Sequence, residues 1–250
     1  MNEAGKIVTA AVLVIGDEIL SGRTKDRNIG YIAEYLTNVG IELREARVVP
    51  DVEEEIVAAL NALRLRYTYV FTTGGIGPTH DDITADAAAK AFGVSIGEDP
   101  RVIQLMLERY KPHELTPARR RMARIPEGAN LVENPISRAP GFRLGNVIVM
   151  AGVPTVMQAM LDSAAKGLET GEKILAETVE AGNIAEGRYG GPLAEIAAAH
   201  QGVTIGSYPA FIDGRFRNQI VIRAKDPARI AAVKKDIDAM LAALGEEGPR

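Results

Sequence analysis

Short apolar runs alternate with amphipathic segments over the first two thirds of the chain. The runs at 7–15, 41–49 and 67–73 are typical of buried strands, because strands covered on both faces carry few alternating polar positions. Between them, apolar residues recur at helical spacing in 28–39 and 51–66. This order predicts βα units and an α/β fold, with a mainly parallel sheet and helices on both faces.

The middle of the chain continues the pattern less regularly. Residues 82–92 form an alanine-rich helical pattern that ends at Gly93, and 99–124 form a helical pattern that two prolines interrupt. A strand at 147–150 precedes a helix whose apolar stripe lies within 156–161. These elements complete the predicted sheet domain.

The tail has a different pattern, so we predict two domains, 1–168 with the active site and 169–250 as a small α+β domain of order βαββα. The tail has neither a carboxylate cluster in a glycine loop nor a histidine pair. We therefore expect it to have a structural or dimer-forming role, and the protein to be a homo-oligomer. Its predicted strands are 178–181, 203–208 and 217–224, and its predicted helices are 192–200 and 227–244.

Composition and charge narrow the classes of function. The 250 residues carry a formal net charge of −4, so they offer no basic surplus for a nucleic-acid partner. The absence of cysteine excludes disulfides and thiolate metal sites and favours a cytoplasmic location. The run at 7–15 is too short to span a membrane and lacks the basic lead and the cleavage site of a signal peptide.

The clearest candidate site is the glycine-rich loop at 72–84, between a predicted strand and a predicted helix. Glycines allow a ligand to approach the backbone closely, and the first N–H groups of a helix favour an anion. The loop matches neither the dinucleotide-binding motif nor the lysine-containing P-loop. We predict that it binds the phosphate of a nucleotide or pterin ligand through Thr73, Gly74, Gly75, Gly77, Pro78, Thr79 and Thr84.

Asp81 and Asp82 follow the glycines directly. One alternative is that Asp82 is only the N-cap of the next helix. Two adjacent carboxylates would repel a phosphate unless a divalent cation or a proton lay between them. We therefore predict a divalent metal (Mg, Mn or Co) held by Asp81 and Asp82 together with Asp17 and Glu18, and catalytic roles for Asp81 and Asp82.

Further candidates follow the first two strands. Gly16, Asp17 and Glu18 come directly after the first strand, and Asn28 and Asp51 begin the next two helices. Because the carboxyl ends of parallel strands share one edge of a sheet, we expect these residues to bind the same ligand as the glycine loop. The alternatives are a solvated acidic loop and two simple N-caps.

The basic and histidine residues are less informative. Arg119, Arg120, Arg121 and Arg124 either clamp phosphates or form a solvated helix face. Of the three histidines, only His80 lies in a candidate motif, which argues against a zinc site built from histidines.

Several stretches occur in an order and spacing that point to one known family. They are Asp26-x-Asn28, Gly74 to Thr84, Asn134-Pro135, Ala139-Pro140-Gly141-Phe142 and Gly152-Val153-Pro154. Over nearly its whole length the chain resembles the CinA-type competence/damage-inducible family of the molybdopterin-binding superfamily. The stretch at 205–209 is similar to part of that family's second small domain.

The resemblance implies functional roles. Asp82 and Asp51 match the two catalytic aspartates of related molybdopterin adenylyltransferases, and the loop at 16–20 resembles a ligand-binding motif of the molybdenum-insertion branch. The resemblance to CinA-type members implies metal-dependent hydrolysis of the pyrophosphate in ADP-ribose. Ala151 and Val156 stand where the family often has proline and glutamate. The same loop and matched aspartates leave a molybdopterin-binding or adenylylating protein as one alternative, and Ala151 and Val156 leave a non-catalytic nucleotide-binding protein as another.

Overall fold

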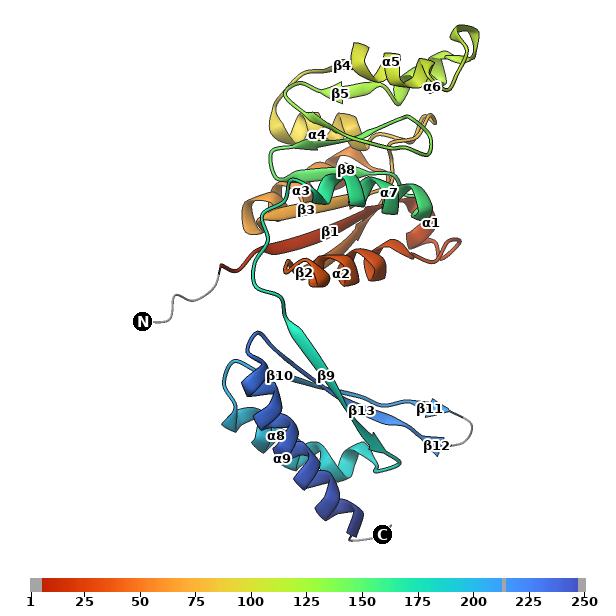
Figure 1. Ribbon diagram of the computed structural model, residues 1–250. Helices are drawn as coiled ribbons and strands as arrows, with labels where there is room; N and C mark the ends of the chain where they lie inside the picture. Colours follow the sequence, from red (N-terminus) through yellow and green to blue (C-terminus); the bar gives the residue numbers. More distant parts are fainter. Residues whose placement is uncertain (1–5, 213–214, 247–250) are drawn as a thin grey trace. The chain divides into compact units, whose positions relative to one another are not determined.

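The computed structural model describes residues 6–212 and 215–246. The chain divides into two compact units that meet between Gly171 and Glu172, whereas we placed the boundary after residue 168 from the sequence. Each unit contains its own hydrophobic core. Figure 1 shows the elements of both units along the chain.

The first unit is built on a six-stranded sheet of order β2-β1-β3-β8-β7-β6. The first four strands in this order are parallel, whereas β7 is antiparallel to β8, and β6 is antiparallel to β7. The predicted mainly parallel sheet is thus confirmed. Its strands are β1 (Thr9–Ile15), β2 (Glu42–Val49), β3 (Tyr69–Thr73), β6 (Asn130–Val132), β7 (Gly141–Leu144) and β8 (Val147–Met150).

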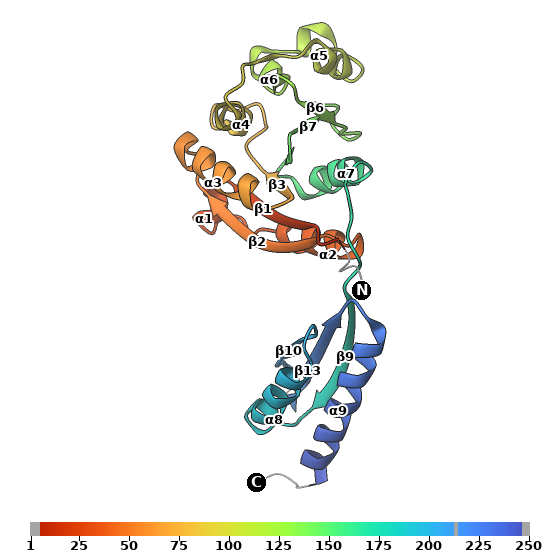
Figure 2. The same ribbon diagram turned by 90° about the vertical axis from the view of Figure 1, so that its left-hand side faces the viewer.

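Helices cover both faces of this sheet, as predicted (Figure 2). Alternate residues of β1 point to opposite faces, so Leu13 and Ile15 pack with α3 and α4, while Val12 and Val14 pack with α2 and α7. Both sets are buried, which explains why β1 is a continuous apolar run. The helices are α2 (Asn28–Asn38), α3 (Glu53–Arg66), α4 (Thr84–Phe92) and α7 (Pro154–Ala165).

An additional segment lies between α4 and β6. Pro112 and Pro117 each begin a new helical segment, where the fixed φ of proline is suitable and no N–H is needed. The predicted interruption by two prolines is confirmed, but β4 and β5, like β6 and β7, were not predicted. These strands have only three or four residues, too few for a clear alternating pattern. The segment contains β4 (Ile96–Glu98), α5 (Pro100–Leu107), the 3-10 helix η1 (Pro112–Glu114), α6 (Pro117–Arg121) and β5 (Arg124–Pro126).

The N-termini of the helices test the alternative in which the candidate site residues act only as N-caps. Neither α3 nor α4 has a side-chain cap, so Asp51 and Asp82 do not cap them. The first N–H groups of α2, those of Asn28 and Ile29, donate to the carboxylate of Asp26 at 3.1 and 2.8 Å. The interpretation of Asp51, Asp82 and Asn28 as simple caps is therefore wrong, and their side chains are used elsewhere.

The second unit has an antiparallel sheet of order β10-β13-β9, with α8 and α9 packed on it. Tyr189, Val233 and Ile237 lie at the centre of its core. The predicted order is observed with an added hairpin, β11 and β12, but the helix predicted to start at Pro192 starts at Glu186. Three glycines in this first part lower its helix propensity and concealed it. The elements are β9 (Leu175–Gly182), α8 (Glu186–Ala199), β10 (Thr204–Tyr208), β11 (Phe211–Ile212), β12 (Arg215–Phe216), β13 (Asn218–Ala224) and α9 (Pro227–Glu246).

Across 6–212 and 215–246, no helix combines the length and the apolar character that a membrane span requires.

Candidate functional site

The parallel strands β1, β2, β3 and β8 end at one edge of the sheet, and a loop leaves each of them there. The N–H of Gly16, after β1, donates to the carbonyl of Val49 at the end of β2 over 3.2 Å. The N–H of Gly74, after β3, donates to the carbonyl of Met150 at the end of β8, also over 3.2 Å. The loops therefore start side by side, at the edge where open α/β sheets bind ligands.

The first half of the glycine loop is folded tightly against the start of α4. The N–H of Thr84 donates to the carbonyl of Gly75 and its hydroxyl donates to the carbonyl of Gly74, both at 2.9 Å. Gly74 and Gly75 have φ values of 103° and 67°. A Cβ on Gly74 would lie 2.1 Å from the carbonyl oxygen of Ile15, and one on Gly75 would lie 2.1 Å from the Thr84 hydroxyl. These positions require glycine.

The second half of the loop is closed by Asp82. Its carboxylate accepts hydrogen bonds from the N–H of Thr79 at 2.8 Å and from the hydroxyl of Thr79 at 2.5 Å. The neighbouring Asp81 side chain is exposed, as is that of His80, which lies 3.9 Å from it. Asp82 is thus the carboxylate that closes the loop, whereas Asp81 is largely exposed, although a hydrogen bond with the Thr79 side chain lowers its pKa.

Asp51 links the loops after β1 and β2. Its carboxylate accepts a hydrogen bond of 2.9 Å from the N–H of Asp17, the first residue of the short helix α1 (Asp17–Leu20). Partial burial raises the pKa of Asp51 above its ordinary value, and the negative charges of Asp17, Glu18 and Asp81 raise it further. Four acidic side chains from three loops are therefore close enough to interact electrostatically.

Asn28 fixes the loop after β8. Its side-chain amide donates to the carbonyl of Gly152 over 2.8 Å, and its Oδ1 is buried without a partner among the described residues. A Cβ on Gly152 would lie 3.3 Å from the Cα of Gly74, so the loop after β8 and the glycine loop are in contact. Asn28, at the start of α2, thereby positions one wall of the site.

These loops enclose a pocket of about 520 Å³, within the usual range of small-molecule sites. Five residues predicted from the sequence line it: Glu18, Gly74, Gly75, Gly77 and Asp82. The other lining residues are Thr24, Ile76, Met122, Asn134, Ser137, Ala139, Ala151, Gly152, Val153, Pro154, Val156 and Met160. The pocket thus combines a glycine loop and two carboxylates with an apolar wall.

The remaining predicted site residues do not line the pocket. Thr73 and Thr84 are buried, and Thr84 instead holds the glycine loop in shape. The others lie in the surrounding loops or support them: Gly16, Asp17, Asn28, Asp51, Pro78, Thr79 and Asp81.

Asn134 is a pocket residue that we did not single out as a site residue from the sequence. Its carboxamide oxygen accepts from the N–H groups of Ile136 and Ser137 at 3.1 and 3.2 Å, and its amide donates to the carbonyl of Ala139 at 2.8 Å. These bonds shape the loop at 134–139, which contributes Asn134, Ser137 and Ala139 to the pocket lining. The Asn-Pro dipeptide, with its strong turn preference, is the signal that could have indicated this loop.

The carboxylates do not form a complete metal site by themselves. In the described part of the chain, no group of three or more His, Cys, Asp or Glu side chains is arranged to hold a metal ion. Hard oxygen donors nevertheless suit Mg²⁺, which typically takes only one or two carboxylates and completes its coordination with water and substrate phosphates.

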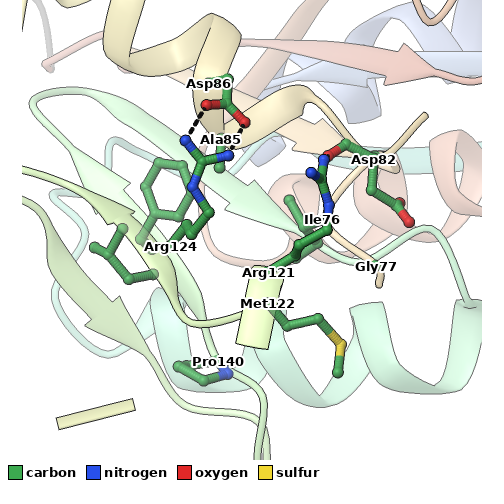
Figure 3. Close-up of a pocket in the computed structure, with 12 residues that line it drawn as sticks. Ile76, Gly77, Asp82, Ala85, Asp86, Arg121, Met122, Arg124 and Pro140 are labelled. Carbon is green, nitrogen blue, oxygen red and sulfur yellow. Dashed lines mark hydrogen bonds and ion pairs between the residues drawn. The ribbon is translucent and has the colours of Figure 1, made fainter. Parts of the chain in front are cut away.

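A smaller cavity of about 20 Å³ lies between the glycine loop and α6 (Figure 3). It is lined in part by Gly75, Gly77 and Asp82, which it shares with the larger pocket, and by Arg121 and Arg124. Of the four arginines considered from the sequence, these two therefore lie beside the loop.

The fold and the site define an α/β protein with a ligand pocket at the carboxyl edge of a parallel sheet. Comparison with known proteins identifies its family. Residues 11–170 match the family model described as "probable molybdopterin binding domain", and residues 174–245 match that of the "FAD synthase, middle domain".

Three similar proteins illustrate the relationship. Protein TV0584 of Thermoplasma volcanium is 31% identical over 237 residues, which cover 92% of this chain and 93% of that protein. A CinA-like protein of Citrifermentans bemidjiense is 43% identical over 159 residues, which cover 61% of this chain but 38% of that protein. A crystal structure of CinA, of unknown function, from Thermoplasma acidophilum has a TM-score of 0.61 and 36% identity, and the match covers 64% of this chain and 97% of that one.

The chain therefore belongs to the CinA-like proteins of the molybdopterin-binding domain family, as its sequence motifs indicate.

Proposed function

We propose that the protein is a metal-dependent nucleotide pyrophosphatase that acts on ADP-ribose or a similar dinucleotide-type pyrophosphate. The observation that carries this proposal is the composition of the pocket. Gly74, Gly75 and Gly77 offer backbone close to a phosphate, while Glu18 and Asp82 stand beside them. The apolar wall suits a flat base, since small-molecule sites are mostly apolar with a few placed polar groups.

The metal would be held by Glu18 and Asp82, with Asp17 and Asp81 nearby, and by oxygens of the substrate phosphates. A divalent ion such as Mg, Mn or Co supplies neutralisation of phosphate charge and polarisation of the phosphoryl oxygen when it is bound. The donor set fits this role, because it consists only of carboxylates, and the charges of Asp17, Glu18 and Asp81 act together on Asp51.

The residues of the chain supply orientation and proton transfer. One oxygen of Asp51 accepts from the Asp17 N–H, and its second oxygen has no hydrogen-bond partner among the described residues. Asp51 would accept a proton from the attacking water as the water oxygen bonds to phosphorus and the bridging P–O bond breaks. The products of ADP-ribose hydrolysis would be AMP and ribose 5-phosphate.

The test is to incubate the purified protein with ADP-ribose and Mg, Mn or Co, and to separate the products by chromatography. We expect AMP to form with at least one metal and not in excess EDTA. The absence of AMP with every metal would contradict the proposal. Binding of ADP-ribose in EDTA without any turnover after metal is restored would instead indicate a non-catalytic nucleotide-binding protein.

A second candidate function is molybdopterin binding or adenylylation, which the family model over residues 11–170 favours. The same loop would bind the pterin phosphate, and the same carboxylates would serve nucleotide transfer. Equilibrium binding separates the two candidates. Tight binding of molybdopterin without measurable binding of ADP-ribose would favour the second candidate over the first.

A further inference from the structure

The arginines at 119–124 have different surroundings, although the sequence does not distinguish them. Arg120 forms an ion pair with Glu98, and Arg124 forms a bidentate pair with Asp86 at 2.8 and 2.6 Å (Figure 3). The guanidinium of Arg119 lies over a tyrosine ring, 4.4 Å from its centroid. Arg119 and Arg120 therefore have partners away from the pocket, and the charge of Arg124, beside the pocket, is neutralised by Asp86.

Arg121 is different from the other three arginines. It lines the small cavity with Gly75, Gly77 and Asp82, and it makes no ion pair within the described part of the chain. One terminal nitrogen donates to the carbonyl of Asp82 at 3.3 Å, which is long for an N–H···O bond. Its Nε is buried and has no hydrogen-bond partner among the residues that the structure describes. A buried polar atom without a partner is costly, so the Nε–H of this partly buried guanidinium is available for an anion.

The charge of the larger pocket supports the same conclusion. Its charged lining residues are Glu18 and Asp82, which are both acidic, and none of its lining residues is Lys or Arg. A phosphate entering this pocket needs a positive charge nearby, and Arg121 lines the adjoining small cavity, which shares Gly75, Gly77 and Asp82 with the pocket. We infer that Arg121 binds a phosphate oxygen of the ligand through its guanidinium; this assignment rests on the phosphate ligand of the proposed function.

The competing explanation is structural. A cavity of about 20 Å³ has room for one water molecule, which could satisfy Nε while the terminal nitrogen braces the Asp82 carbonyl. The two explanations differ in their consequences. Substituting a phosphate-binding residue lowers the affinity only for ligands that carry phosphate. Substituting a structural brace, a residue that only holds the loop in shape, lowers the affinity for every ligand of the pocket.

The experiment is calorimetric titration of the full chain with inorganic pyrophosphate, AMP and adenosine. Arg121→Gln should weaken pyrophosphate and AMP binding by about tenfold to a hundredfold, the loss expected for one charge-assisted hydrogen bond. Adenosine binding should be unchanged. Arg120→Gln is the matched control on the same helix, because Arg120 lines neither cavity, and it should change each affinity by less than about twofold under the same screening.

Arg121→Lys provides a second variant that keeps the charge. Its affinity for pyrophosphate should be measurable and should lie between that of the wild type and that of Arg121→Gln. Unchanged pyrophosphate affinity in Arg121→Gln, or no pyrophosphate binding by the wild type, would overturn the assignment. An equal loss for adenosine and AMP, with a lower melting temperature, would also overturn it in favour of the brace. Because these are binding measurements, a protein that fails to hydrolyse ADP-ribose can still satisfy them.

Discussion

The carboxylate of Asp51 accepts a hydrogen bond of 2.9 Å from the backbone N–H of Asp17. This bond joins the loops that follow β1 and β2, which are neighbours in the sheet. It also holds one oxygen of Asp51 in a fixed orientation near Glu18, the acidic residue of α1 that lines the pocket. The contact therefore serves as a structural tie and orients a candidate catalytic group.

Asp51→Asn separates these two roles. The carboxamide oxygen can still accept from the Asp17 N–H, so the free energy of unfolding should change by less than about 1 kcal/mol, the scale of one neutral hydrogen bond. The amide cannot accept a proton from water, so kcat for ADP-ribose hydrolysis should fall by about 10²-fold to 10⁴-fold. Urea unfolding and steady-state kinetics measure the two quantities. Wild-type kcat in a correctly folded Asp51→Asn variant would remove Asp51 from the proposed mechanism.

Asp82→Asn tests the carboxylate that closes the glycine loop. Asparagine can still accept from the Thr79 N–H, which keeps the loop closed, but it loses the charge proposed to hold the metal. We expect turnover to fall at least about a hundredfold, with a higher metal concentration needed for half-maximal rate. Asp81→Asn is the comparison variant, because the Asp81 side chain is exposed and should cause a smaller loss. The reverse order of the two losses would transfer the metal-binding role to Asp81.

The sequence predicts the parts of this site that depend on local pattern. The glycines of the loop at 72–84 can be recognised because a positive φ favours glycine. The strand β1 can be recognised because burial on both faces requires a continuous apolar run. Asp51 was ambiguous, since aspartate before a helix pattern suits both a cap and a site. Met160 and Asn134 reach the pocket from segments far apart in the sequence, and only the tertiary fold brings them together. For the same reason, the sequence alone does not separate Arg121 from Arg120.

Glu45 provides a pH-dependent contribution to stability away from the site. Hydrogen bonds first from Arg47 and then from Tyr67 lower its pKa below 4.5. Such a group stabilises the folded state above its unfolded pKa, and this contribution is lost as the pH falls through the lower folded pKa. Glu45→Gln should therefore destabilise the protein by less than about 1 kcal/mol at pH 7, since the ion pairs are partly exposed. The difference from the wild type, measured by urea unfolding, should disappear as the pH falls well below 4.5, and a constant difference at all pH values would contradict this account.

Gly75→Ala tests whether the shape of the glycine loop is required, and Gly93→Ala is its matched control. Both glycines have nearly the same left-handed φ, 67° and 68°. A Cβ at Gly93 would meet no atom within 4 Å, so this substitution should cost only the left-handed backbone penalty of about 1–2 kcal/mol. A Cβ at Gly75 would lie 2.1 Å from the Thr84 hydroxyl, which is buried and bonded to Gly74. Gly75→Ala should therefore lose more stability than Gly93→Ala in urea unfolding, and also lose AMP binding, which Gly93→Ala should keep. Equal losses of stability with intact AMP binding in both variants would show that the loop can shift to accept a side chain, and that its tight fold is not what forms the phosphate site.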